Sequence, residues 1–188
     1  MWFEKKLSLK IDDAEKKFPI EVLNITDLTE LEIIGGDFQY ISEYILHLVN
    51  LRKLSIVSTK ISDFPKEIFE LPNLEYLSLK NNRIKTLPVL NRPCRLKTLI
   101  LNKNYIHDLK IFKNNFEFLE TLDLGANLIT EVPDYFGELK NLKRLNLEMN
   151  LISVIPYQLK NLPNLCSINL DHNKFSQREL DEIYKLKF

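Results

Sequence analysis

The stretch LNLEMNLISVIP, residues 145–156, decides the fold because related stretches recur along the chain. LDLGANLITEVP (residues 122–133) lies 23 residues upstream, and LSLKNNRIKTLP (residues 77–88) lies earlier still. On a helix, Asn146 and Asn150 would share one face, because residues four apart are neighbours there. The alternating leucines instead predict a short strand, on which successive side chains point to opposite faces. The two asparagines are therefore expected to have different roles.

The recurrence forms a regular array with the template L-x-x-L-x-L-x-x-N-x-I. Successive units begin 22 or 23 residues apart, at Leu51, Leu74, Leu96, Leu119, Leu142 and Leu165. The asparagine position is occupied in turn by Thr59, Asn82, Asn104, Asn127, Asn150 and Asn173.

Two weaker units precede this array. The unit that begins at Leu28 fits the template with Gly36 in place of asparagine. Residues 4–27 fit it only loosely, because Glu4 stands at the first apolar position. Terminal repeats are commonly atypical because they shield the open end of the shared core. We therefore expect residues 4–27 to form a degenerate N-terminal cap unit.

The second half of several units identifies the family that the array resembles. The segments FPKEIFELPN (residues 64–73), VPDYFGELKN (residues 132–141) and IPYQLKNLPN (residues 155–164) are similar to the L-P-x-x-I-x-x-L-x-N form. This form is typical of the 23-residue class of leucine-rich repeats, which is common in bacterial proteins of the spirochaete type. The resemblance covers nearly the whole chain. It implies an α/β solenoid: a horseshoe of about eight units, with one parallel concave β-sheet and an irregular or 3₁₀-helical convex side.

Two units depart from the convex pattern. LPVLNRPCR (residues 87–95) is one residue short, and LKIFKNNFEF (residues 109–118) lacks proline and carries three phenylalanines. We therefore expect an irregular convex surface over residues 88–118. If these phenylalanines were exposed, they would offer a contact for self-association; they are Phe112, Phe116 and Phe118.

The C-terminal segment predicts a capping helix over residues 177–187. Ser176 is followed three residues later by Glu179, which is a capping-box signature. Apolar residues then recur at helical spacing, at Leu180, Ile183 and Leu186. The chain is thus expected to form one leucine-rich repeat domain, residues 1–188, with its cap unit at 4–27, its repeats at 28–175 and its C-terminal cap at 176–188.

Composition excludes several classes of function. Lys+Arg and Asp+Glu number 26 each, so the overall charge directs the protein neither to nucleic acid nor to an anionic membrane. No segment approaches the ~20 apolar residues of a membrane span. The first residues contain no secretory apolar region, which favours a cytoplasmic location and leaves secretion by a non-classical route open. Cys94 and Cys166 lack metal-ligand spacing and indicate two reduced thiols.

No catalytic or cofactor motif is present. His47, His107 and His172 are scattered, and the chain has no phosphate-binding loop, nucleophile elbow or zinc motif. We therefore expect a protein that is not an enzyme and has neither a metal nor a cofactor.

The repeated asparagines are expected to support the scaffold. After each strand the chain bends inward and leaves backbone groups without sheet partners, and an asparagine amide supplies both donors and an acceptor. The family resemblance implies the same role. The predicted ladder consists of Asn82, Asn104, Asn127, Asn150 and Asn173.

The outward strand positions are the candidate binding surface. Four apolar residues that the template does not require lie among them: Ile34, Val57, Tyr76 and Ile100. An exposed tyrosine among aliphatic residues resembles an interface hot spot. These positions predict binding of a protein or peptide to the concave sheet.

The C-terminal part of the same surface is polar and acidic. The remaining candidate residues for partner binding are Asp123, Arg144, Asn146, Glu148, Asn169 and Asp171. Glu148 and Asp171 would lie close together, which is unfavourable unless a cation or Arg144 compensates. Two alternatives remain open. One is binding of a small ligand or divalent cation at this acidic groove, and the other is a self-associating structural protein. The expected oligomeric state is a monomer or a weak homodimer.

Overall fold

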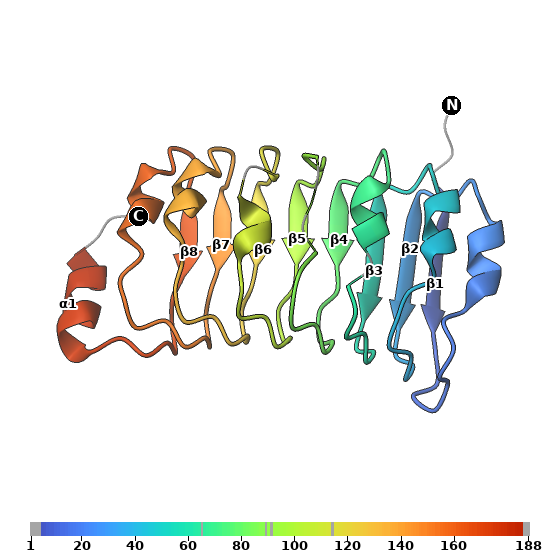
Figure 1. The fold of residues 1–188 in the computed structure, drawn as a ribbon, viewed down its shortest axis with the longest axis horizontal. Coiled ribbons are helices and arrows are strands. Elements are labelled where there is room, and N and C mark those ends of the chain that lie inside the picture. The colour runs from blue at the N-terminus through green and yellow to red at the C-terminus, as the bar shows by residue number, and fades with distance from the viewer. Residues whose placement is uncertain (1–4, 65, 89, 91, 114, 186–188) are drawn as a thin grey trace.

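The protein contains one eight-stranded parallel sheet, and the segments that connect its strands lie side by side along it (Figure 1). The computed structural model describes residues 5–64, 66–88, 90, 92–113 and 115–185. Each strand pairs with the next in sequence, so the strands follow one another in order across the sheet. They are β1 (Lys6–Lys10), β2 (Glu30–Ile34), β3 (Lys53–Val57), β4 (Tyr76–Ser78), β5 (Thr98–Ile100), β6 (Thr121–Asp123), β7 (Arg144–Asn146) and β8 (Ser167–Asn169).

The strands form where the leucines alternate with other residues. Because side chains alternate between the two faces of a strand, the repeated leucines all turn to the same side. Leu54, Leu77, Leu99 and Leu122 occupy equivalent positions in four consecutive strands, and each is 0% exposed. This inward face provides one continuous hydrophobic core along the stack.

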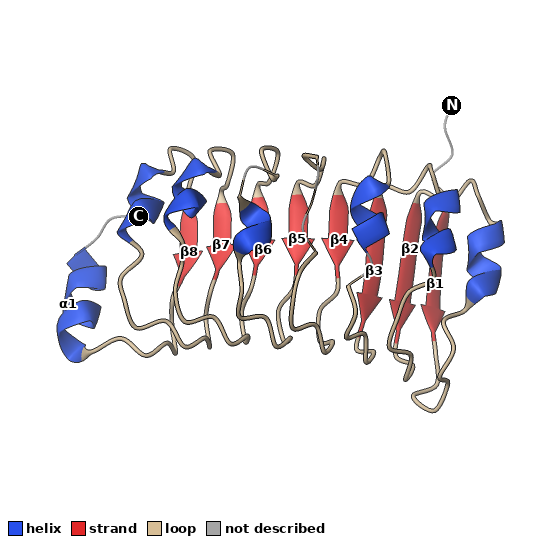
Figure 2. Cartoon of the chain, viewed as in Figure 1, coloured by secondary structure: helices blue, strands red, loops and turns tan. Residues whose placement is uncertain are grey.

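Short 3₁₀ helices lie on the other side of this core (Figure 2). Pro19, Pro133 and Pro156 directly precede three of them. The proline ring fixes φ and lacks the N–H that a helix start leaves unpaired. Their buried residues, such as Ile45 and Phe136, pack into the shared core. The helices are η1 (Ile20–Asn24), η2 (Glu43–His47), η3 (Lys66–Glu70), η4 (Lys110–Phe112), η5 (Asp134–Glu138) and η6 (Tyr157–Asn161).

The convex side is irregular between η3 and η4, where the sequence departs from the template. The described residues between these two helices contain no helix, and η4 has only three residues. The expected exposed phenylalanine cluster is wrong for two of its three members. Phe112 and Phe116 are each only 1% exposed, with ring centroids 5.0 Å apart, because they pack against aromatic rings of neighbouring units, Phe112 against Phe136 and Phe116 against Phe69. Phe118 alone is exposed.

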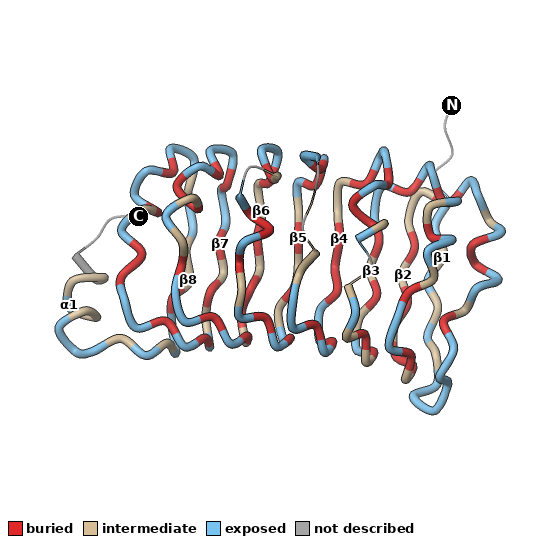
Figure 3. The backbone as a smooth tube through the Cα atoms, viewed as in Figure 1, coloured by how far each residue is buried: buried red, intermediate tan, exposed pale blue. Residues whose placement is uncertain are grey.

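Burial is greatest in the middle of the stack (Figure 3). At the N-terminal end, Leu7 and Leu9 of β1 are only half-buried, and at the C-terminal end so are Leu165 and Ile168. A repeat at an end has a neighbour on one side only, so its inward residues lose half of their packing partners.

Every strand from β3 onward is followed, either directly or three residues after its end, by a residue in the left-handed conformation. This conformation turns the chain inward, and L-residues adopt it at a cost of about 1–2 kcal/mol. The φ angles lie between 52° and 58°, at Ser58, Asn81, Lys103, Ala126, Met149 and His172. In the second unit a glycine, Gly35, takes this position with φ 86°.

The helix α1 (Gln177–Lys185) follows the last strand. Ser176 and Glu179 form the predicted capping box, in which the Ser176 N–H donates to Glu179 at 2.8 Å and the Glu179 N–H donates back to the Ser176 hydroxyl at 3.4 Å. Ile183 packs against the end of the core. The predicted Leu186 contact and the residues beyond Lys185 lie outside the described part of the chain.

The expected architecture is confirmed: one open parallel sheet of eight strands, 3₁₀ turns on the opposite side and a single C-terminal helix. The short strands and the 23-residue period account for it. Each unit has one inward apolar face, and only stacking can bury that face.

Candidate functional site

The outer face of the sheet consists of three columns of side chains, which we call the outer sheet face. Strand register aligns the first two columns, and backbone hydrogen bonds from the left-handed residues extend the third beyond β3. The first column is Lys6, Glu30, Lys53, Tyr76, Thr98, Thr121, Arg144 and Ser167. The second is Ser8, Glu32, Ser55, Ser78, Ile100, Asp123, Asn146 and Asn169. The third is Lys10, Ile34, Val57, Lys80, Asn102, Gly125, Glu148 and Asp171.

The four apolar candidates form two pairs on this face. Ile34 and Val57 are direct register partners on β2 and β3. Tyr76 and Ile100 lie on adjacent strands in a diagonal relation, which brings side chains within reach of each other when one is aromatic. All four are half-buried, so part of each side chain packs against its neighbours and part remains accessible to a partner.

A hollow of about 290 Å³ lies beside Tyr76. Lys53, Glu75, Lys97 and Thr98 contribute to its lining, so charged groups surround the tyrosine ring. Lys53 pairs with Glu30 at 3.1 Å, and so does Lys6 from the other side. A partner side chain entering this hollow would contact both an aromatic surface and charged groups.

The C-terminal part of the outer sheet face is a hydrogen-bonded network. Asp123 Oδ1 accepts hydrogen bonds from the Gly125 N–H at 3.0 Å and from Asn146 Nδ2 at 2.9 Å. Asn146 Oδ1 in turn accepts from the Glu148 N–H at 3.0 Å. Both polar ends of the Asn146 amide are therefore engaged within the molecule, so this residue supports the sheet surface as well as facing outward.

The same arrangement repeats one unit further along. Asn169 Nδ2 donates to the Glu148 carboxylate at 2.8 Å, and Asn169 Oδ1 accepts from the Asp171 N–H at 2.9 Å. Gly125 makes the network possible, because a Cβ there would lie 2.8 Å from Asn146 Nδ2 and 3.1 Å from Glu148 Cγ. A larger residue would displace the asparagine that bonds Asp123.

Burial raises the pKa of Asp123 above its usual value, and the nearby Glu148 carboxylate adds to the rise. Hydrogen bonds from Gly125 and Asn146 act in the opposite direction but do not cancel it. Removing a carboxylate from water disfavours its charged form, which explains the direction. The surroundings of Asp123 therefore favour its protonated form more than water does.

Within the acidic pair, the Glu148 carboxylate accepts a hydrogen bond from Asn169 Nδ2 at 2.8 Å. Arg144 lies two columns away, where Lys143 and, more weakly, Arg144 lower the pKa of Glu120. Compensation of Glu148 and Asp171 by a cation stays a prediction. Among the described residues, no group of three or more His, Cys, Asp or Glu side chains could hold a metal ion. The described acidic side chains of this face thus offer no support for the binding of a divalent cation.

The inward asparagines bridge consecutive units. Asn127 Nδ2 donates to the carbonyls of Leu101 at 3.1 Å and Leu124 at 2.9 Å, and its Oδ1 accepts from the Ile106 N–H at 2.9 Å. One side chain thus satisfies three backbone groups, two of them in the preceding unit. The same bonds recur at Asn82, Asn104, Asn150 and Asn173. At the exceptional first position the Thr59 hydroxyl bonds Asn82 Oδ1.

A second asparagine series escaped the sequence reasoning. The final asparagine of several units donates its Nδ2 to a carbonyl oxygen of the preceding unit; an example is Asn73, which bonds the Val49 oxygen at 2.9 Å. The sequence does contain a sign of this series, because the convex segments that resemble L-P-x-x-I-x-x-L-x-N end in asparagine. These exposed residues are Asn50, Asn73, Asn141 and Asn164.

Two buried polar atoms on the outer sheet face have no hydrogen-bond partner among the described residues. They are Asn102 Oδ1 and Thr121 Oγ1, from the third and first columns near β5 and β6. Buried polar groups are normally satisfied, so the centre of the face carries an unmet hydrogen-bonding demand.

Nothing in the described part of the chain resembles a transmembrane helix, because no helix there has the required length and apolar character. Of the two cysteines, Cys94 is buried and Cys166 is exposed, and neither is in a disulfide.

Comparison with known proteins agrees with this geometry. A family model described as leucine rich repeat matches residues 49–106 and 117–175, and a second, for two copies of the repeat, matches residues 94–137. A comparison with curated proteins gave no significant match.

Several solved structures are similar over most of the chain. A leucine-rich repeat protein of Leptospira interrogans is 32% identical with a TM-score of 0.75, over 92% of this chain and 50% of that one. An internalin of Listeria monocytogenes is 26% identical with a TM-score of 0.75, over 90% of this chain and 48% of that one.

Internalin C2 of the same organism is 28% identical with a TM-score of 0.72, over 88% of this chain and 70% of that one. The chain thus spans about half the length of the first two proteins. The Leptospira similarity confirms the expected resemblance to bacterial repeats of the spirochaete type. Since the family model covers more than half of the sequence and the stacked units show the same repeat, the chain belongs to the leucine-rich repeat family.

Proposed function

We propose that the protein is an interaction module that binds a protein or peptide through the outer sheet face. One observation carries this proposal: among the described residues no element covers the outer face of the eight-stranded sheet, because the 3₁₀ helices lie on the opposite side (Figure 2). This face displays half-buried apolar side chains. Leucine-rich repeat domains generally mediate protein–protein interaction. The likeness to internalins supports the same class of function.

Tyr76 and Ile100 are the proposed anchors. Hot spots are enriched in tyrosine and lie in well-packed positions with a polar surround, and Tyr76 has charged neighbours on both sides of its strand. Ile34 and Val57 extend the apolar area towards β2. The polar network around Asp123, together with Arg144, would supply orientation rather than most of the affinity.

We propose no catalytic role. Leucine-rich repeat proteins are typically non-enzymatic, and the candidate residues here form a hydrogen-bonded surface instead of a nucleophile–base arrangement. The equal numbers of acidic and basic residues favour a protein or peptide over nucleic acid or a membrane surface. A monomer or weak dimer is the proposed state, and light scattering over a concentration series tests it.

Site-specific photocrosslinking tests the binding face. A photoreactive phenylalanine analogue is placed at Tyr76, or at Tyr44 and Tyr157 on the convex side as controls, and crosslinked partners are identified by mass spectrometry. We expect one partner to be captured from position 76 and not from the controls. Calorimetry with that purified partner should then show weaker binding for Tyr76→Ala and Ile100→Ser. Equal capture from all three positions, or unchanged affinity of both variants, contradicts the proposal.

A further inference from the structure

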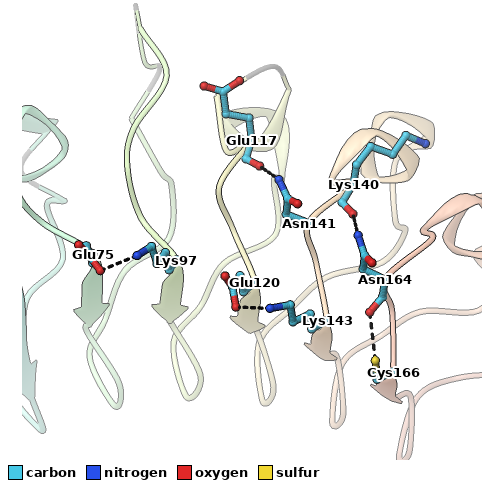
Figure 4. A network of polar contacts seen from close by, with 9 residues as sticks. All are labelled: Glu75, Lys97, Glu117, Glu120, Lys140, Asn141, Lys143, Asn164 and Cys166. Carbon is cyan, nitrogen blue, oxygen red and sulfur yellow. Dashed lines mark hydrogen bonds and ion pairs between the residues drawn. The ribbon is translucent and has the colours of Figure 1, made fainter.

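The residues that directly precede each strand form a charged row, which we call the strand-start rim. Backbone hydrogen bonds join its neighbours, such as the Lys97 N–H to the Glu75 oxygen at 2.9 Å. Two ion pairs lie along it, Glu75–Lys97 at 2.9 Å and Glu120–Lys143 at 2.7 Å (Figure 4). The rim consists of Lys5, Thr29, Arg52, Glu75, Lys97, Glu120, Lys143 and Cys166.

The exposed asparagine series beside this rim is interrupted at two consecutive units. Asn73 and Asn141 stand on either side of the interruption and bond the preceding unit (Figure 4 shows Asn141). At the two positions between them the chain carries Arg95 and Phe118 instead of asparagine. These belong to the same two units that depart from the convex pattern, so here the backbone-bridging amides give way to a cation and an aromatic ring.

A hollow of about 300 Å³ opens at this interruption. Arg52, Glu75 and Lys97 of the strand-start rim line it, together with Arg95 and Phe118. The Phe118 side chain is 47% exposed, although the phenylalanines nearest to it in sequence are buried in the core. The hollow thus combines three cations, one carboxylate and one accessible aromatic surface.

The positive charge in this hollow is only partly neutralised. Glu75 is already bonded to Lys97, as the raised pKa of that lysine reflects. Among the described residues, neither Arg52 nor Arg95 forms an ion pair or a side-chain hydrogen bond. Arg52 acts on Lys97 in the repulsive sense, because its charge lowers the lysine pKa. Two guanidinium groups therefore remain available to an anionic group from outside.

We infer that this hollow binds an acidic peptide segment of a protein partner, with carboxylates on Arg52 and Arg95 and an apolar side chain against Phe118. A guanidinium binds a carboxylate through two parallel N–H donors, which gives both charge and geometric selectivity. A ring that is half exposed beside unpaired arginines has the composition of a binding hot spot. This surface lies on the strand-start rim and adjoins the hollow beside Tyr76, with which it shares Arg52, Glu75 and Lys97. Arg95 and Phe118 line this hollow and not the one beside Tyr76.

The composition of the hollow favours a peptide over a nucleic acid. Nucleic acid binding uses rows of cations that follow the phosphate backbone, whereas this rim alternates cations with Glu75 and Glu120. The chain as a whole carries no net charge. An acidic peptide needs only two anionic contacts and one apolar contact, and the hollow supplies these.

Fluorescence anisotropy tests the inference with three labelled probes: a peptide of alternating glutamate and phenylalanine, the same peptide with glutamine for glutamate, and an oligothymidylate. The first should bind, and raised salt should weaken it because exposed charges are screened. The doubly substituted protein Arg52→Glu, Arg95→Glu should bind it about 2- to 30-fold more weakly, as the loss of two exposed ion pairs implies. Phe118→Ser should also weaken it, with the charges intact.

The matched control is Arg83→Glu with Arg178→Glu, which makes the same change of net charge at exposed arginines outside the hollow. It should bind the acidic peptide as the unsubstituted protein does, and circular dichroism melts should show that all variants are folded. Three results overturn the inference: no binding of the acidic peptide, equal loss in the control protein, or equal affinity for the glutamine peptide. Tighter binding of the oligothymidylate through Arg52 and Arg95 would overturn the peptide assignment.

Discussion

Asn146 Nδ2 donates a hydrogen bond of 2.9 Å to Asp123 Oδ1, although the two residues are separated by a whole repeat. The bond lies on the outer sheet face and ties β6 to β7 beside their backbone pairing. An asparagine that faces outward thus also stabilises the sheet. A partner that contacts Asn146 meets an amide already fixed in orientation, which lowers the entropy lost on binding.

Asp123→Asn should stabilise the protein at neutral pH. Because the pKa of Asp123 is raised in the folded state, its contribution to stability is fully present below the unfolded pKa, near 3.8, and is lost as the pH rises through the folded pKa. Asparagine keeps the oxygen that accepts from Gly125 and Asn146 but carries no charge. Urea denaturation at pH 7 and pH 3 measures the change. The gain should be present at pH 7 and absent at pH 3, and an equal effect at both contradicts the electrostatic origin.

Asn127→Ala should lower the free energy of unfolding by about 1–3 kcal/mol or more, because three buried backbone groups lose a partner. The matched control is Asn141→Ala, which removes an exposed amide with a single backbone bond to Glu117. Its loss should be smaller, at about 0.5–1.5 kcal/mol, the net value of an ordinary hydrogen bond. Chemical denaturation measures both variants. Equal losses would show that burial does not decide the strength of the ladder.

Ala126→Gly should stabilise the protein by up to about 1 kcal/mol. Ala126 has φ 52°, where glycine meets no penalty from a Cβ, and this gain outweighs the greater freedom of glycine in the unfolded chain. Ala14 provides the control because it is exposed and is not among the positive-φ residues. Ala14→Gly should therefore be neutral or destabilising. Thermal melts of the two variants decide the matter, and a loss of stability in Ala126→Gly would contradict the proposed strain.

The two thiols should differ in reactivity. Burial raises the pKa of Cys94 to about 11, so almost no thiolate forms at neutral pH, whereas Cys166 is exposed. Titration with a chromogenic disulfide reagent should reveal one fast thiol in the folded protein and both after denaturation. Cys166→Ser should remove the fast reaction, and Cys94→Ser should leave it unchanged. A fast reaction that survives Cys166→Ser would contradict the assignment.

The repeat made most of the scaffold predictable from the sequence. Inward positions such as Leu122 and Asn127 recur in unit after unit, so period and residue type together determine which side chains are buried. The strand register follows, because adjacent units align at equivalent positions. No comparable repetition constrains the outward positions, and their contacts depend on side-chain conformations. The donation from Asn169 to Glu148 is therefore a finding of the structure alone.

The error over the phenylalanines has the same origin. The unit containing Phe112 and Phe116 lacks the proline of the regular units, and its sequence does not show which of its rings pack against the neighbouring units. The structure places Phe112 and Phe116 inside and Phe118 outside. Breaks in a repeat are thus where sequence reasoning fails, and in this chain a break also produces the basic hollow.

The inward asparagine ladder gives the solenoid a direction of assembly. Asn127 bonds backbone groups of its own unit and of the unit before it, and Asn150 repeats this one step later. Each unit is therefore completed by the one that follows it in the chain. During synthesis from the N-terminus, every newly emerged unit would bring the asparagine that bonds the unpaired backbone groups of the unit before it. We expect the nascent protein to consolidate one unit behind the ribosome exit, with only the youngest unit unfinished at any moment.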